Sequence, residues 1–232
     1  MCNFSIKDNL AIVHQQLSQA ATEAGRSPED IQLIAVSKTK PAEMISKAVL
    51  ANHNVFGENK VQEAISKMSA LNNIDNIEWH LIGHLQKNKV KFCPGNFKWI
   101  HSIDSIELAK KLEEQCALKQ QNINVLIQIN LSQEKSKYGI QQFDELFQLA
   151  ETLHAGHWIK LRGLMTIPEP DLGEASTRKI FEKLRMWRDQ LQKELCAPEI
   201  NELSMGMTAD FKWAIQEGAT MIRLGTAIFG PR

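Results

Sequence analysis

A lysine that follows an apolar run is the first residue whose type and position suggest chemistry. Lys38 comes just after the run over residues 31–36, so a strand there would place the amine at its carboxyl end. Partial desolvation lowers the pKa of a lysine, and the neutral amine can form a Schiff base with a carbonyl group. The alternative is a surface lysine whose stem lies along the strand end while its ammonium group stays in water.

Glycines and hydroxyl residues near the carboxyl end of the sequence indicate a site for an anion. Ser204 and Gly206 follow one apolar run, and Gly225 and Thr226 follow the last one. Glycine lets backbone N–H groups approach an anion closely, and hydroxyl groups add donors. These glycines could also be plain turn residues. A carbonyl-trapping lysine combined with a phosphate site suggests a phosphorylated aldehyde: pyridoxal phosphate or, less specifically, a sugar phosphate bound by a Schiff-base aldolase.

The elements that must position these residues repeat in a regular order. Eight short apolar runs alternate with amphipathic helical patterns, as parallel strands buried beneath helices should. The runs cover residues 31–36, 54–57, 77–82, 98–103, 123–131, 160–165, 200–205 and 220–224. We therefore predict an α/β fold: a single (β/α)8 TIM-type barrel domain over residues 1–232, with an extra N-terminal helix over 5–25. An open doubly wound sheet is the weaker alternative, because no Gly-x-Gly-x-x-Gly fingerprint follows any run.

Such a barrel gathers its functional residues at the carboxyl ends of the strands. In this sequence those positions are mostly polar. They are Lys38, Glu58, Asn59, His84, His101, Ser102, Lys135, Lys137, Tyr138, Met165, Thr166, Ser204, Gly206, Arg223, Gly225 and Thr226.

Composition argues against several other classes of function. The chain has 27 basic and 27 acidic residues, so its formal net charge is zero, which disfavours nucleic acids and anionic membranes as partners. No apolar stretch approaches the roughly 18 residues of a membrane span, and the amino terminus does not resemble a signal peptide. We expect a cytoplasmic protein.

Cysteine and histidine spacing does not favour a metal site. The cysteines are scattered without a Cys-x-x-Cys pair, which is typical of reduced thiols. His80 and His84 are four residues apart, but no third ligand is evident, so we predict no metal. We interpret three further histidines as surface residues: His53, His154 and His157.

Six motifs together resemble the pyridoxal-phosphate homeostasis protein family. They are AVSKTKP at 35–41, FGEN at 56–59, WHLIGHLQKNK at 79–89, GLM at 163–165, LSMGMT at 203–208 and IRLGTAIFG at 222–230. The resemblance covers almost the whole chain and implies a single-domain barrel of the alanine-racemase type. It also implies that Lys38 carries pyridoxal phosphate as an internal aldimine, the Schiff base between its amine and the cofactor aldehyde.

The resemblance also implies roles for the other strand-end residues. Ser204, Gly206, Gly225 and Thr226 would hold the phosphate, and Arg223 would face the pyridine nitrogen. Asn59 and His84 would line the cofactor pocket, and Met165, in the motif at 163–165, completes the set of predicted cofactor-binding residues.

The family is described as binding and buffering the cofactor without established turnover. A cation such as Arg223 beside the pyridine nitrogen disfavours its protonation and weakens the ring as an electron sink. Racemisation needs an acid-base group on each face of the cofactor. Alanine racemases take the second one from a tyrosine on a further domain, which we do not expect here, and Tyr138 is interpreted as a loop residue with its hydroxyl in water.

We therefore expect a carrier of pyridoxal phosphate rather than an enzyme, acting as a monomer and releasing the cofactor to apo-enzymes. A low-activity amino-acid racemase is the alternative.

Overall fold

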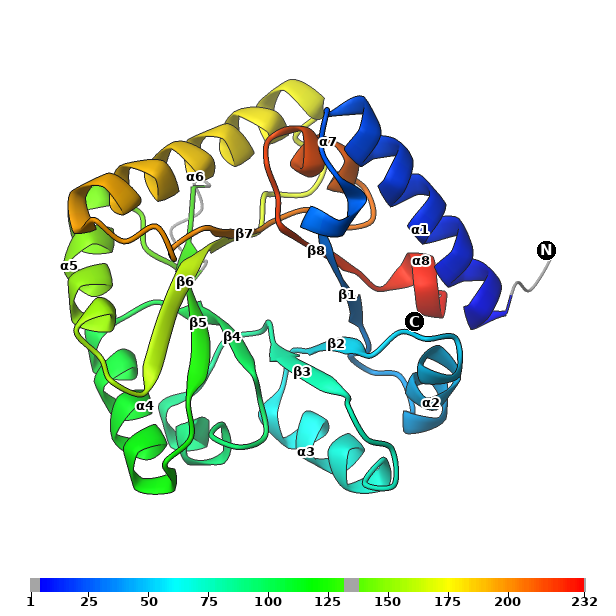
Figure 1. Ribbon diagram of the computed structural model, residues 1–232, viewed down its shortest axis with the longest axis horizontal. Coiled ribbons are helices and arrows are strands. Elements are labelled where there is room, and N and C mark those ends of the chain that lie inside the picture. The colour runs from blue at the N-terminus through cyan, green and yellow to red at the C-terminus, as the bar shows by residue number, and fades with distance from the viewer. Residues whose placement is uncertain (1–4, 132–137, 232) are drawn as a thin grey trace.

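The computed structural model describes residues 5–131 and 138–231 (Figure 1). Lys135 and Lys137, two of the predicted strand-end residues, lie outside this range.

Eight parallel strands close into a barrel in the order of the sequence, from β1 to β8 (Figure 1). The first and last strands pair directly, with Ile34 opposite Arg223. This topology confirms the predicted (β/α)8 fold, and each strand ends within two residues of its predicted run. The strands are β1 Gln32–Val36, β2 Val55–Glu58, β3 Glu78–Leu81, β4 Trp99–Ile103, β5 Ile123–Ile129, β6 Ile159–Thr166, β7 Glu202–Ser204 and β8 Met221–Leu224.

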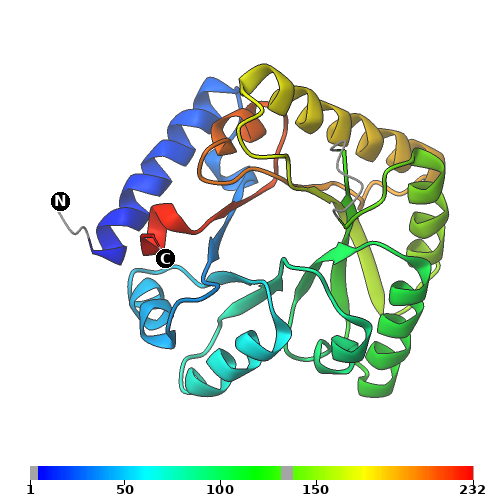
Figure 2. The same cartoon turned by 180° about the vertical axis from the view of Figure 1, so that it is seen from behind.

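Helices form an outer ring around the strands in both views (Figures 1 and 2). The connection between β3 and β4 carries a 3-10 helix, η2, and the last two helices are short. The helices are α1 Ile6–Glu23, α2 Ala42–Leu50, α3 Val61–Ala70, α4 Ile106–Lys119, α5 Phe143–His154, α6 Glu174–Leu195, α7 Phe211–Gln216 and α8 Thr226–Phe229, with 3-10 helices η1 Pro28–Asp30 and η2 Lys87–Phe92.

The predicted N-terminal helix is α1, and its start is set by a capping box. The Ser5 side chain accepts a hydrogen bond from the Asp8 N–H, and the Asp8 carboxylate accepts one from the Ser5 N–H. Leu10, Val13 and Leu17 lie on its buried face. Helix α1 packs against α2, α7 and α8, and therefore covers the seam where the first and last barrel units meet (Figure 2).

Alternation along the strands divides the core into two regions. On β8, Met221 packs inside the barrel with Ile34 and Met165, whereas Ile222 and Leu224 pack in the larger core beneath the helices. Because the next inward residue after Met221 is Arg223, this strand delivers a charged side chain to the carboxyl end of the barrel. Among residues 5–131 and 138–231, we find no helix with the length and apolar character of a membrane span.

The sequence interpretation of His53 is wrong. Its exposed fraction is 6%, and its Nε2 lies 2.8 Å from the Val55 carbonyl oxygen. The residue precedes β2, and its ring packs edge-on against Phe56, with centroids 5.5 Å apart. A histidine in a short polar loop between a helix and a strand gave no indication of this burial. His154 and His157 are exposed, as predicted.

Candidate functional site

A cavity of about 510 Å³ opens at the carboxyl ends of the strands, where the barrel was expected to gather its functional residues. Six of the nine predicted cofactor-binding residues line it: Lys38, Asn59, His84, Arg223, Gly225 and Thr226. The other lining residues are Val36, Ile82, Gly83, Gln128, Tyr138, Ile167, Met207, Thr208 and Ala209.

The three remaining predicted residues lie behind this lining. Met165 is fully buried in the apolar cluster inside the barrel. The Ser204 hydroxyl is also fully buried and accepts a hydrogen bond from Arg223. Gly206 has a φ of 95°, and a Cβ there would lie 2.6 Å from the Cβ of Ala214. Direct contact of these three residues with a cofactor stays a prediction.

Arg223 supplies a fixed positive charge to the cavity. Its exposed fraction is 4%, and its Nη1 donates to the Ser204 hydroxyl at 2.6 Å. Its Nη2 donates to the Thr166 carbonyl at 2.9 Å. Burial lowers the pKa of the guanidinium to about 10, with Asp210 opposing the shift, so the group remains charged at neutral pH. Two anchored nitrogens fix the plane of the guanidinium.

A buried ion cluster supports the strand ends beside Lys38. The ammonium of Lys67, on α3, donates to Glu58 at 2.6 Å, to Glu63 at 2.7 Å and to the Ser37 carbonyl at 2.8 Å. The Ser37 hydroxyl donates to the same Glu58 oxygen at 2.6 Å. Burial raises the pKa of Glu58, and the hydrogen bonds from Lys67 and Ser37 oppose that shift.

The loop that carries Lys38 is held on both sides of this residue. Ser37 precedes it and belongs to the ion cluster. Thr39 follows it in the left-handed region, with a φ of 65°, and donates its N–H to the Glu63 carboxylate. The Lys40 ammonium donates to the Pro231 carbonyl at 2.6 Å, which connects this loop to the carboxyl end of the chain. The sequence pattern did not predict this role of Lys67. The only indication in the sequence is that this lysine lies beside the apolar stripe of a helix.

One wall of the cavity is a pair of stacked rings. The His84 and Tyr138 ring centroids are 3.7 Å apart with an interplanar angle of 13°. The Asp104 carboxylate lies 3.7 Å from His84 Nδ1, and the Gln128 amide donates to the Tyr138 carbonyl at 3.1 Å. Burial raises the pKa of Asp104, and the neighbouring His84 opposes that shift. The sequence placed Tyr138 in a loop and gave it no role, whereas it lines the cavity.

Hydroxyl groups gather on the side of the cavity formed by the loops after β7 and β8. The Thr226 and Thr208 hydroxyl oxygens lie 3.3 Å apart. A Cβ at Gly225 would lie 3.2 Å from the Val36 carbonyl oxygen, so this loop approaches the end of β1 closely. The amine, the fixed guanidinium and these hydroxyls give the cavity one nucleophile and donors for anionic or basic ligand atoms.

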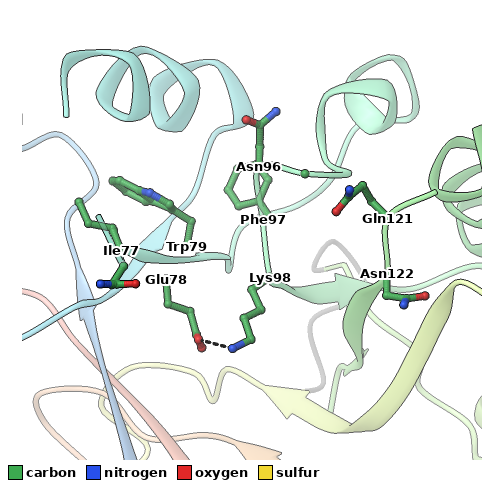
Figure 3. Close-up of a pocket in the computed structure, with 10 residues that line it drawn as sticks. Ile77, Glu78, Trp79, Asn96, Phe97, Lys98, Gln121 and Asn122 are labelled. Atoms are coloured by element: carbon green, nitrogen blue, oxygen red, sulfur yellow. Dashed lines mark ion pairs between the residues drawn. The ribbon is translucent and has the colours of Figure 1, made fainter. Parts of the chain in front are cut away.

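Another cavity, of about 500 Å³, lies at the opposite end of the barrel (Figure 3). Its lining comes mainly from the amino ends of β3, β4 and β5 and contains the Glu78–Lys98 ion pair, with 2.8 Å between Glu78 Oε2 and Lys98 Nζ. Among the described residues, no cluster of three or more His, Cys, Asp or Glu side chains is arranged to hold a metal ion.

The closed barrel and the cavity at its carboxyl end define a protein of the alanine-racemase barrel class. The family model described as "Alanine racemase, N-terminal domain" matches residues 9–232. The pyridoxal phosphate homeostasis protein of Escherichia coli (strain K12) is 43% identical over 229 residues, which are 98% of this chain and 97% of that protein. Its counterpart in Pasteurella multocida (strain Pm70) is 44% identical over 230 residues, covering 98% of each. The chain belongs to the pyridoxal phosphate homeostasis protein family.

Solved structures agree with this assignment. PipY of Synechococcus elongatus PCC7942, solved with PLP bound, superposes with a TM-score of 0.87 at 36% identity, covering 97% of this chain and all of that one. The alanine racemase of Bacillus anthracis superposes with a TM-score of 0.72 at 15% identity, covering 98% of this chain and 56% of that one. The second likeness shows the shared barrel fold alone.

Proposed function

We propose that the protein binds pyridoxal phosphate, holds its aldehyde as a Schiff base on Lys38, and takes part in pyridoxal phosphate homeostasis in the cytoplasm. The observation that carries the proposal is that Lys38 and the buried cation Arg223 line one cavity of about 510 Å³. The PLP-bound structure of PipY and the names of the relatives support it.

The residues of the cavity fit this cofactor. Pyridoxal phosphate supplies an aldehyde and an electron-accepting ring when it is bound. Lys38 would engage the aldehyde, and Arg223 would donate a hydrogen bond to the ring nitrogen. The hydroxyls of Thr226 and Thr208, with the backbone at Gly225, would hold the phosphate. The His84–Tyr138 stack would form part of the pocket wall.

The electrostatics of the cavity favour a carrier. Arg223 stays charged at neutral pH, and a cationic donor disfavours a protonated pyridine nitrogen, which would otherwise help the ring to stabilise a carbanion. We propose that the protein shields the aldehyde and releases it to apo-enzymes. A monomer remains our prediction for the oligomeric state.

A low-activity amino-acid racemase is the second candidate function. The position of Tyr138 in the cavity lining supports it. Racemisation requires a proton donor or acceptor on each face of the cofactor. Lys38 and Tyr138 both line the cavity, so each could in principle exchange a proton with a substrate.

Titration of the apoprotein with pyridoxal phosphate tests the proposal. We expect a visible absorbance band that borohydride removes, leaving the added mass on the peptide with Lys38. Lys38→Ala should abolish the band, and Lys47→Ala, at an exposed lysine of α2, should leave it intact. An unchanged band in Lys38→Ala would overturn the assignment. Exchange of amino-acid α-hydrogens with solvent deuterium at an enzymatic rate, lost in Tyr138→Phe, would favour the racemase.

A further inference from the structure

A chain of buried polar side chains runs through the barrel behind Arg223. Arg223 Nη1 lies 2.6 Å from Ser204 Oγ, which lies 2.9 Å from His101 Nδ1. His101 Nε2 lies 2.8 Å from His80 Nδ1, and His80 Nε2 lies 2.9 Å from Glu78 Oε1. The chain uses residues of β8, β7, β4 and β3 and reaches the Glu78–Lys98 ion pair in the opposite cavity (Figure 3).

The chemistry of the two ends sets the direction of every hydrogen bond in this chain. A guanidinium can only donate, and a carboxylate can only accept. Neutral Ser204, His101 and His80 each contribute one polar hydrogen, and Arg223 contributes one more to its contact with Ser204. The four contacts therefore contain one hydrogen each when all of them point from Arg223 toward Glu78. Both imidazoles are then neutral and carry their hydrogen on Nε2.

The surroundings of the two histidines support this neutral state. His80 is fully buried, faces Glu78, Lys98 and His101, and stacks on Trp99. Burial is the main cause that lowers the pKa of His80, while Glu78 raises it and Lys98 lowers it. Burial also lowers the pKa of His101, and His80 and Arg223 lower it further. An extra proton on either imidazole would place two hydrogens in one short contact unless the Ser204 hydroxyl turned its own hydrogen away from His101.

We propose that Ser204, His101 and His80 are positioning residues that fix Arg223 beside the ring nitrogen of the cofactor and connect it to Glu78 at the far end of the barrel. The statement about the ring rests on the proposed function. A buried guanidinium is costly unless its hydrogens are accepted, and Asp210 is the carboxylate whose charge acts on it. Ser204 can accept from Arg223 and donate onward because His101 presents a lone pair, and His101 does so because His80 accepts its hydrogen.

Histidine ¹⁵N NMR of the apoprotein tests the chain without any cofactor. We expect His80 and His101 to show the Nε2–H tautomer and to stay neutral between pH 7 and the onset of acid unfolding. Ser204→Ala should shift the His101 Nδ1 resonance, because that nitrogen loses its donor. An Nδ1–H tautomer or a protonated ring at His101 at neutral pH would overturn the proposal.

Cofactor titration tests the positioning role. Ser204→Ala removes one charge-assisted hydrogen bond of Arg223, and His101→Phe removes the acceptor that orients the Ser204 hydroxyl. Each variant should weaken pyridoxal phosphate binding about tenfold and displace its absorbance band. His101→Gln keeps a donor and an acceptor in one side chain and should restore both readouts. Ile100→Val, a buried neighbour on β4 without polar atoms, is the matched control and should leave the band in place.

The two proposals fail in different ways. If wild type binds no pyridoxal phosphate, the proposed function fails, and the NMR experiment still decides the hydrogen-bond chain. If wild type binds it and Ser204→Ala and His101→Phe bind it with the same affinity and the same band, the positioning role fails.

Discussion

The ring of Tyr138 lies parallel to the imidazole of His84, with centroids 3.7 Å apart and an interplanar angle of 13°. The tyrosine comes from the segment after β5 and the histidine from the segment after β3. The stack therefore connects two loops across the mouth of the cavity, although 57% of Tyr138 remains exposed.

The stack predicts different results for two substitutions of Tyr138. Tyr138→Phe keeps the aromatic face and should bind pyridoxal phosphate as wild type does. Tyr138→Ala removes the ring that stacks on His84, so one wall of the cavity is lost. We expect the affinity for pyridoxal phosphate to be several-fold lower. Titration followed by absorbance measures both. A loss of equal size in the two variants would mean that the hydroxyl matters, which would favour a role in proton transfer.

Removing the cation of the buried ion cluster should strongly destabilise the barrel. The side chains of Lys67 and Glu58 have exposed fractions of 9% and 0%, so Lys67→Met leaves a buried carboxylate without its main partner. Loss of one partner of such a pair lowers the free energy of unfolding by about 3–5 kcal/mol. The double variant Lys67→Met/Glu58→Gln should recover part of that loss. Urea unfolding measures both, and a Lys67→Met protein as stable as wild type would contradict this account.

Because His53 is buried, we expect the protein to lose stability in mild acid. Burial is the main cause that lowers its pKa from 6.5 to about 4, with the Val55 carbonyl opposing and His14 adding to the shift. Between these values the unfolded state binds a proton that the folded state does not. The free energy of unfolding therefore decreases as the pH falls below 6.5, by up to about 1.4 kcal/mol per pH unit from this residue.

His53→Gln keeps a donor near the Val55 carbonyl and does not titrate in this range, so it should flatten the pH profile of urea unfolding. His157→Gln, at an exposed position, serves as the control. An identical slope in wild type and His53→Gln would show that the pKa of His53 is the same in the folded and the unfolded protein.

Two glycines that both have a positive φ should respond differently to alanine. Gly206 has a φ of 95° and lacks space, since a Cβ would lie 2.6 Å from the Cβ of Ala214, whereas Gly173 has a φ of 74° and nothing within 4 Å. Gly206→Ala should therefore lower the melting temperature more than Gly173→Ala. It should also weaken cofactor binding by displacing the adjacent residues 207–209 of the cavity. Equal melting temperatures for the two variants would contradict the crowding at Gly206.

The sequence predicted the barrel and most of the lining because both follow from strand positions. An apolar run predicts a strand, and the second residue after the run lies at the cavity, as Lys38 and Asn59 do. Depth within the barrel is harder to predict. Met165 and Ser204 also lie at strand ends, but their side chains point inward one layer below the cavity.

The sequence pattern could not predict contacts between a helix and a strand end. Lys67 reaches Glu58 and the Ser37 carbonyl because of the way α3 lies on the barrel, and no periodicity reports that placement. The pairing of His80 with His101 likewise depends on the register between β3 and β4, which places His80 opposite Trp99.

The pairing of β1 with β8 also determines when the site can exist. Lys38 follows the first strand and Arg223 lies on the last one, so the two come together only when Ile34 and Arg223 pair and the barrel closes. Contacts this distant in sequence form late and slow the folding of a chain. During synthesis, the amine at Lys38 would thus be made long before its cationic neighbour, and a nascent chain would acquire a complete binding site only after the last strand leaves the ribosome.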